Sequence, residues 1–308
     1  MIDNIKFYIS GKDSFESFIL NDGTVELKAS KSFLTNEVQD YPKRGKLGNL
    51  EVVINQKRAY IKGSIHKLEN LIDEDGSQNY DDFSFCQMNT IIDEIISYFN
   101  VSGRTSISQL EIGLNMHIPM NPQRFLKNHL LMCDFRDHNK DLPFRGKGDY
   151  KEFMRTDYHL KVYNKSKQYH VNAHILRVEL KILSKRKLRE FGIENLEDLQ
   201  NKTAIERLFK FLMEEVKKCT IIDDYNAVMM PIEDREKFYR YTNPNYWIIL
   251  KDTKSLKIQS RHKKDFQALC AKYHLTTIKN VLMKKMIEKF WHLLKCTSPQ
   301  GSEYVNAA

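Results

Sequence analysis

Alternation of apolar and polar residues recurs in several short stretches of the chain, and each predicts a β-strand. The clearest is QLEIGLNMHIP at 109–119, where every second residue is apolar and Pro119 ends the run. Further strands are predicted at 4–9, 24–29, 157–164 and 174–183, together with a hairpin over 50–66 that turns at Asn55-Gln56-Lys57. Short links or single helices join these strands, which favours a mostly antiparallel sheet.

Apolar residues spaced three and four apart predict helices between and after the strands. The predicted helices cover 83–99, 122–132, 196–220, 260–273 and 276–295. The expected fold is therefore α+β, a mostly antiparallel sheet with helices on one face, followed by a small helical C-terminal unit. A shift toward Lys, Arg and aromatic residues places the expected boundary near 225–235, giving domains at 1–230 and 231–308.

Strand parity sorts the side chains of the predicted sheet by face. One face is apolar in every strand, so it must be the core side. The other face gathers polar residues, which are Tyr60, Lys62, Ser64, His66, Glu111, Asn115, His117, His159, Lys161, Tyr163, Arg177, Glu179 and Lys181. A solvated sheet face would also be polar, so parity alone does not establish a site.

The mixture of residue types on this face suits phosphodiester chemistry. Glu111, Glu179 and His117 offer the oxygen and nitrogen ligands of a divalent cation such as Mg²⁺ or Mn²⁺. Tyr163 lies between Lys161 and Lys165, two residues from each. Nearby cations favour the phenolate form, which is the form that attacks phosphorus. Two rival interpretations remain. Tyr158 or Tyr169 could be the nucleophile, and Arg177 and Glu179 could form an ordinary exposed ion pair, worth less than about 1 kcal/mol.

The charge of the chain favours a polyanionic partner. Lys and Arg total 49 against 40 Asp and Glu, for a net charge of +9. In the polar stretch 138–149, which is expected to be a mobile loop, Arg145 and Lys147 are candidate DNA contacts. The basic helical region 231–308 is expected to bind DNA, and Lys284 and Lys285 in its last predicted helix are candidate contacts, unless that helix only packs through its apolar stripe.

Cysteines and the first residues of the chain indicate its compartment. The five scattered cysteines contain no CxxC pair, which argues against a disulfide framework and against a structural zinc site. The sequence MIDNIKFYIS lacks the apolar run of a signal peptide, and no stretch reaches the roughly 18 apolar residues of a membrane span. A cytoplasmic protein without a membrane partner is expected.

Taken in order, five short motifs resemble the rolling-circle replication initiators of the phage and plasmid gene II/X type, which are tyrosine nickases. They are KGSIHK at 62–67, NYDDF at 79–83, LEIGLN at 110–115, LKVYNK at 160–165 and LRVEL at 176–180. The resemblance spans roughly residues 1–230. It implies a metal-dependent enzyme that nicks one strand at a replication origin, forms a 5′-phosphotyrosine and later rejoins the strand.

Carried over to this sequence, the resemblance makes Tyr163 the nucleophile and Glu111 and Glu179 the acidic metal-site residues. Arg177 and Lys165 become phosphate contacts. It also implies origin DNA, single-stranded or extruded as a hairpin, as the partner, with host helicase and polymerase as further partners.

One departure from the family pattern weakens the metal assignment. Better-known relatives place two histidines around one hydrophobic residue on a single strand, whereas this chain has only Met116-His117-Ile118. His66 on another predicted strand is a possible partner. Two other functions remain open: a non-catalytic origin- or operator-binding protein, and a plasmid mobilisation relaxase with the same chemistry.

Overall fold

The computed structural model of the protein describes residues 1–308 except 32–33, 35, 140–149, 227 and 297–308. The chain forms two compact units, each assembled from separated segments. Residues 1–110, 188–205 and 287–308 form the first unit, and 111–187 and 206–286 form the second. Both contain antiparallel strands and helices, which confirms the predicted α+β class. Within the described residues, no helix combines the length and apolar composition that a membrane crossing needs.

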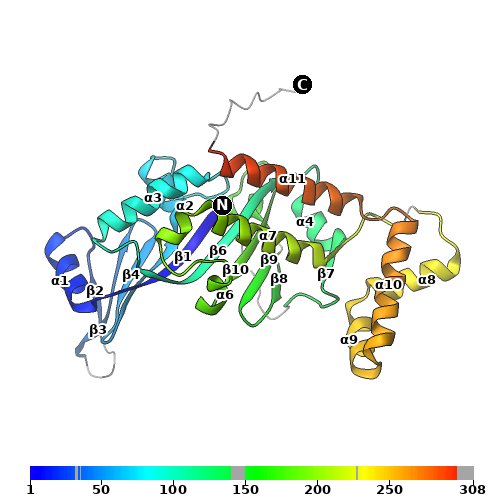
Figure 1. Ribbon diagram of the computed structural model, residues 1–308, viewed down its shortest axis with the longest axis horizontal. Coiled ribbons are helices and arrows are strands. Elements are labelled where there is room, and N and C mark those ends of the chain that lie inside the picture. Colours follow the sequence, from blue (N-terminus) through cyan, green and yellow to red (C-terminus); the bar gives the residue numbers. More distant parts are fainter. Residues whose placement is uncertain (32–33, 35, 140–149, 227, 297–308) are drawn as a thin grey trace. The chain divides into compact units, whose positions relative to one another are not determined.

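Five strands of the first unit lie in the order β2-β3-β4-β5-β1 (Figure 1). Their bounds are β1 Ile2–Ile9, β2 Lys28–Lys31, β3 Val38–Leu47, β4 Leu50–Ile54 and β5 Ala59–Ser64. Each strand is antiparallel to its neighbours in this order, and β4 and β5 form the predicted hairpin. Strand β3 was not predicted, because its segment VQDYPKRGKL is largely polar and exposed and shows no regular alternation.

Three helices belong to the same unit: α1 (Lys12–Asp22), α2 (Ile65–Ile72) and α3 (Phe85–Tyr98). Helix α3 starts at a capping box in which Ser84 and Gln87 satisfy each other's backbone amides. Ile91, Ile92 and Ile95, from the apolar stripe that the sequence predicts, are buried, and so is Met88. Helices α2 and α3 lie beside each other on this sheet (Figure 1).

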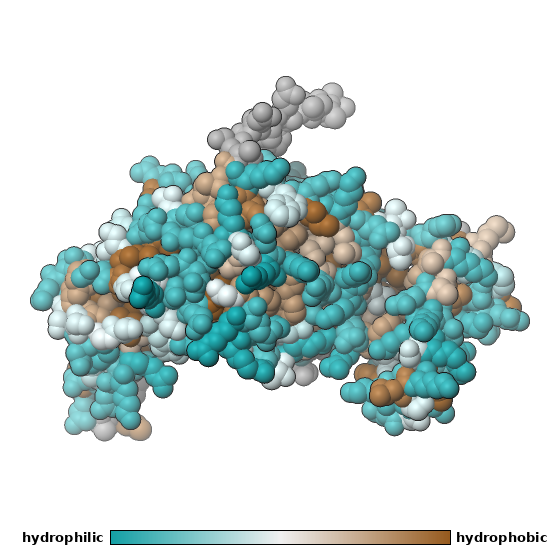
Figure 2. Space-filling view, in the orientation of Figure 1, coloured by the Kyte–Doolittle hydropathy of each residue, from teal (hydrophilic) through white to brown (hydrophobic). Residues whose placement is uncertain are grey.

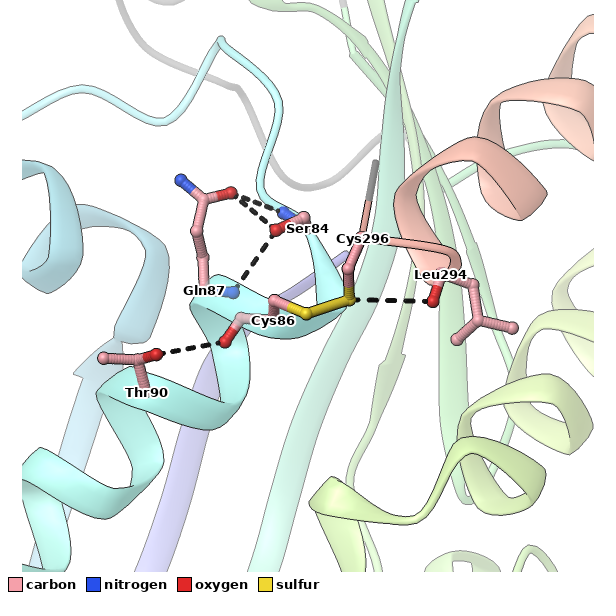
Figure 3. Close-up of a disulfide and its surroundings, with 6 residues drawn as sticks. All are labelled: Ser84, Cys86, Gln87, Thr90, Leu294 and Cys296. Atoms are coloured by element: carbon pink, nitrogen blue, oxygen red, sulfur yellow. Dashed lines mark hydrogen bonds between the residues drawn. A yellow bond between two sulfur atoms is a disulfide. The ribbon is translucent and has the colours of Figure 1, made fainter. Parts of the chain in front are cut away.

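A disulfide joins Cys86 of α3 to Cys296, just after the last helix, across 210 residues of sequence (Figure 3). The dispersed cysteines argued against a disulfide framework, but these two form one disulfide. Sequence spacing could not reveal the pair, because only the fold brings the two positions to a Cα–Cα distance of 5.6 Å. Cys133, Cys219 and Cys270 are free and buried.

The sheet of the second unit contains the strands that carry the predicted site. Strand β6 (Ser106–His117) begins in the first unit and continues into the second, where the order is β6-β10-β9-β8. The other bounds are β8 Tyr150–Met154, β9 Tyr158–Asn164 and β10 Ile175–Ile182. Strand β10 pairs antiparallel with β9, and β9 with β8. Leu160, Val162, Leu176, Val178 and Leu180 are buried, as parity requires.

Short elements complete this unit around the long helix α7 (Lys202–Lys218). On the apolar side of the sheet, Tyr158 of β9 packs edge-on against Phe211 of α7, at 4.9 Å between ring centroids. The predicted helix 122–132 is instead α4 (Pro122–Arg124), a π-helical turn Phe125–His129 and strand β7 (Leu130–Cys133), which pairs with β11 (Cys219–Ile221). Helices α5 (Lys165–Tyr169) and α6 (Lys185–Arg189) follow β9 and β10, and a short 3₁₀ turn of the first unit, Glu197–Gln200, precedes α7.

The C-terminal helices are α8 (Ile232–Thr242), α9 (Pro244–Thr253), α10 (Leu256–Lys272) and α11 (Thr277–Leu294). The first three share a core that includes Phe238, Tyr241, Trp247 and Phe266, and Met132 and Ile222 belong to the same cluster. Because of this shared core, α8–α10 are part of the second unit, and the boundary expected near residue 230 falls inside it. Helix α11 runs from the second unit into the first.

Candidate active site

Strand register brings the predicted site residues of the second unit together on one face. Lys161 is paired with Glu179, and Tyr163 with Arg177, across β9 and β10. On the other side of β9, Tyr150 of β8 is the partner of Tyr163. Residues at paired positions point to the same side of a sheet, so these side chains meet as parity predicts.

Two carboxylates and their cations form the centre of this face. Lys161 Nζ donates to Glu111 Oε1 at 2.9 Å and to Glu179 Oε1 at 3.2 Å. Arg177 Nε donates to the other oxygen of Glu179 at 3.0 Å, and Lys181 Nζ lies 3.4 Å from Glu111 Oε1. We call these five residues the acid–base cluster. Three cations face two carboxylates, so the cluster carries a formal charge of +1.

The phenol of Tyr163 belongs to this arrangement. Its hydroxyl donates to Glu179 Oε2 at 3.3 Å, the oxygen that also accepts from Arg177. Lys165, at the start of α5, places Nζ 5.6 Å from the centroid of the Tyr163 ring. Asn164 caps α5 by accepting from the backbone amide of Lys167, which fixes the end of β9 next to the phenol. The nucleophile, the acid and the cations predicted from sequence are thus neighbours.

Burial distinguishes this face from an ordinary solvated one. Glu111 is 7% exposed, and Arg177 and Glu179 are each 2% exposed. An exposed ion pair is therefore excluded for Arg177 and Glu179, because both charges are removed from water. Burial of Lys161 disfavours its ammonium, but attraction from Glu179 and Glu111 outweighs it, and the pKa of Lys161 is raised.

A second acid–base pair lies beside the cluster. His159 Nδ1 lies 2.7 Å from Glu152 Oε1, and Glu152 is the cross-strand partner of Lys161. Tyr150 is hydrogen-bonded to Glu152, and burial together with this carboxylate raises the pKa of the Tyr150 phenol. Tyr150 is consequently held as a neutral phenol next to Tyr163.

Gly113 explains how β6 approaches β10 at this point. A Cβ atom at Gly113 would lie 2.4 Å from Glu179 Cβ and 2.6 Å from the carbonyl oxygen of Val178. Only a residue without a side chain fits there, which is why the LEIGLN segment has glycine between Glu111 and Asn115. Asn115 Oδ1 accepts from Arg177 Nη1 at 3.2 Å, so the same strand orients the guanidinium.

The chemistry of Glu111 and Glu179 fits Mg²⁺ or Mn²⁺, which prefer carboxylate oxygens. Their oxygens accept from Lys161, so a divalent cation has to compete with that ammonium for them. His117 does not join them, because it lies six residues from Glu111 on β6, roughly 20 Å along an extended strand. The structure thus separates the predicted histidine ligand from the two acids.

In the first unit, His66 is also not placed as predicted. It lies in the first turn of α2 rather than in a strand, since the Ser64 side chain caps that helix. The His66 ring stacks on Phe83 at 4.6 Å, with Nε2 3.1 Å from Asp81 Oδ1. Burial lowers the pKa of His66 against the opposing effect of Asp81, which favours a neutral imidazole.

Asp3 of β1 is a buried carboxylate that the sequence interpretation missed. Its side chain is 2% exposed and offers an oxygen of the type that binds metal ions. Ser64 Oγ and Asn79 Nδ2 donate to its two oxygens, the latter at 2.7 Å. The signal was present in the sequence, because Asp3 interrupts an apolar N-terminal segment and both of its partners lie in predicted motifs.

The remaining predicted DNA contacts are dispersed. Lys181 lies at the edge of the acid–base cluster, 35% exposed, and Lys165 is buried. Lys284 and Lys285 are exposed on α11 in the second unit, outside the cluster. Arg145 and Lys147 lie outside the described residues.

Comparison with known proteins gives one relevant likeness. No family model and no curated protein matches the chain. A solved structure titled as a rolling circle replication initiator protein from Geobacillus stearothermophilus is similar, with a TM-score of 0.41 and 12% sequence identity. The likeness covers 74% of this chain and 88% of that one. It names the class of protein that the sequence motifs resemble, but at this level it assigns no role to any residue.

Proposed function

We propose that the protein is a DNA strand-nicking and strand-joining enzyme that starts rolling-circle replication, with Tyr163 as its nucleophile. The observation that carries the proposal is the hydrogen bond from the Tyr163 hydroxyl to the buried Glu179, whose carboxylate also bonds to Lys161 and Arg177. The Glu179 carboxylate can accept the proton that the Tyr163 hydroxyl must lose. A phosphodiester beside three cations has its charge stabilised.

The proposed reaction is a transesterification. The Tyr163 oxygen attacks the scissile phosphorus and forms a new O–P bond, while the bond from phosphorus to the 3′-oxygen breaks. Glu179 accepts the phenol proton, and the leaving oxygen takes up a proton to become a 3′-hydroxyl. Reversal, with a 3′-hydroxyl attacking the phosphotyrosine, rejoins the strand without an external energy source.

Glu111 and Glu179 are the residues that would hold Mg²⁺ or Mn²⁺. When bound, such an ion would draw charge from a non-bridging phosphate oxygen. Arg177 is held by Glu179 and Asn115 and would orient the same phosphate group. Lys161 would hold the two carboxylates in position.

The test is covalent capture on DNA. The purified chain is incubated with Mn²⁺ and a pool of single-stranded oligonucleotides of random sequence, and adducts that survive SDS are digested and mapped by mass spectrometry. We expect a phosphorylated peptide containing Tyr163, and loss of the adduct in the variant Tyr163→Phe. Tyr150→Phe is the matched control, because Tyr150 is the cross-strand neighbour on the same face.

Other outcomes identify the rival interpretations. An adduct on Tyr150, Tyr158 or Tyr169 would show that a different phenol is the nucleophile. A salt-sensitive gel shift with no adduct under any metal condition would leave a non-catalytic DNA-binding protein. A relaxase would give the same adduct, and would be distinguished by transfer of the nicked strand between cells.

A further inference from the structure

The three helices α8–α10 form a small helical group, and the residues that pack on its inner side are known. Phe266, Leu269 and Cys270 of α10 are buried against Trp247 and Leu250 of α9 in one apolar cluster. His262 of α10 adds a polar contact, since its Nδ1 lies 3.0 Å from the Tyr241 hydroxyl and 3.1 Å from that of Tyr246. With this side fixed inward, the opposite side of α10 must face outward.

That outward side is a line of cations. Lys257, Arg261 and Lys264 follow one another at spacings of four and three residues, which places them on one face of the helix, and all three are exposed. Lys251, near the end of α9, and Lys254, in the turn before α10, are exposed as well. We call these five residues the α10 basic surface. Over residues 244–272 the chain has seven Lys or Arg against two Asp, an excess of five within a chain total of +9.

Internal neutralisation does not explain this surface. Among the described residues, none of its five side chains takes part in a hydrogen bond or an ion pair. Their neighbours on the same helix differ: Lys272 pairs with Asp234 at 2.7 Å, and Lys263 lies 4.7 Å above the Phe135 ring. Asp252 and Asp265 are exposed beside these cations, so the region keeps an excess of positive charge that repels itself, and a polyanion removes that cost.

We infer that the α10 basic surface binds double-stranded DNA, with α10 in the major groove. Its 17 residues give a rigid rod roughly 25 Å long with an outward face of cations and small polar residues, which fits a groove about 12 Å wide. Proteins that hold single strands rely on stacking aromatic side chains, and the outward face of α10 has none. A membrane-bound helix needs a continuous apolar face, whereas the large apolar residue exposed on α10 is Leu256 in its first turn.

The space-filling view agrees with this division. Hydrophilic residues cover most of the visible surface over α8–α10, and the few hydrophobic spots are small and separate (Figure 2). Helix α11, predicted from sequence to contact DNA, is less suited. Its Lys279 donates to the backbone carbonyls of Lys217 and Cys219, and its Lys289 pairs with Asp82. These two lysines serve the protein's own packing.

The test uses the full chain and a fluorescein-labelled random-sequence duplex of about 25 base pairs, with binding followed by anisotropy between about 50 and about 200 mM salt. The double variant Lys257→Gln/Arg261→Gln should bind roughly 10- to 100-fold more weakly at the higher salt, and its log–log salt slope should fall by about 2. Lys284→Gln/Lys285→Gln removes the same charge from α11 and should change binding less than about 3-fold.

Equal losses in both double variants, or none in the α10 variant, would overturn the inference. So would tighter binding to vesicles of anionic lipid than to duplex DNA. The inference stands apart from the proposed nickase. The α10 variant should still form the covalent adduct on single-stranded DNA, and Tyr163→Phe should still bind duplex DNA with the unaltered salt slope.

Discussion

Replacing Lys161 with Met tests whether its ammonium stabilises the buried carboxylates Glu111 and Glu179. Met keeps the length and the apolar stem of Lys161 and removes only the ammonium, which bonds to Glu111 at 2.9 Å and to Glu179 at 3.2 Å. Arg177 and Lys181 still contact one carboxylate each, but the shared cation between the two acids is lost. Glu111 and Glu179 are then two buried like charges with nothing between them.

The expected magnitude follows from burial. Removing one partner of a buried ion pair costs about 3–5 kcal/mol, because a charge remains without compensation in a medium of low polarity. Lys181→Met is the matched control. Its side chain is 35% exposed and its nitrogen lies 3.4 Å from Glu111, so the loss should be below about 1 kcal/mol. The double variant Lys161→Met/Glu111→Gln should recover part of the loss, since one of the two buried negative charges is gone.

Urea unfolding with and without Mg²⁺ or Mn²⁺ measures both parts of the argument. A divalent cation binding between the two carboxylates should stabilise Lys161→Met by about 2.7 kcal/mol at 100 times its dissociation constant, and the wild type by less. Chelation with EDTA should remove that difference. A cost below about 1 kcal/mol for Lys161→Met, or equal metal stabilisation of both proteins, would refute the view that Lys161 and a metal compete for the same oxygens.

Three further changes probe other parts of the fold. Gly113→Ala should lower stability by about 1–3 kcal/mol and reduce adduct formation, because its Cβ would overlap Glu179; circular dichroism and the capture assay check it. Cys86→Ser, or reduction of the wild type, should cost about 2–5 kcal/mol in thermal unfolding, and a midpoint insensitive to reductant would contradict the disulfide. Burial raises the pKa of Glu69 to about 7, so the wild type should lose roughly 1–3 kcal/mol as pH rises from 4.5 through 7. Glu69→Gln should flatten that profile in melting experiments, and an unchanged profile would contradict it.

The sequence predicted the centre of the site well because a strand has a period of two. Once β6, β9 and β10 were recognised, parity alone selected Glu111, Lys161 and Glu179 for one face, and the register confirms that Lys161 and Glu179 are paired. Strand β8 was missed because it follows a polar stretch and is only five residues long. Its contribution, Tyr150 and Glu152, was missed with it.

Features that depend on distant parts of the chain were not predictable in the same way. Strand parity predicts which face of the sheet a side chain is on, but not whether other parts of the protein cover that face. A solvated polar face was therefore an open alternative, whereas Arg177 and Glu179 are almost fully buried. His66 was assigned to a strand because the predicted strand runs to residue 66, whereas the observed strand ends two residues earlier, at Ser64, which caps α2. The Cys86–Cys296 disulfide depends on tertiary proximity across 210 residues of sequence, which no local pattern carries.

DNA contacts made by the acid–base cluster and by the α10 basic surface should depend differently on salt, because the cations of the two groups have different partners. Lys161 and Arg177 already bond to carboxylates inside the protein, so a phosphate that meets them releases few counterions. The α10 basic surface is exposed to solvent, so each of its phosphate contacts does release counterions. Raising the salt concentration should therefore weaken duplex binding steeply, while the rate of adduct formation on saturating single-stranded DNA should hardly change. If the adduct rate at saturation falls as steeply as the affinity, the cations of the acid–base cluster are not held by Glu111 and Glu179 when DNA is bound.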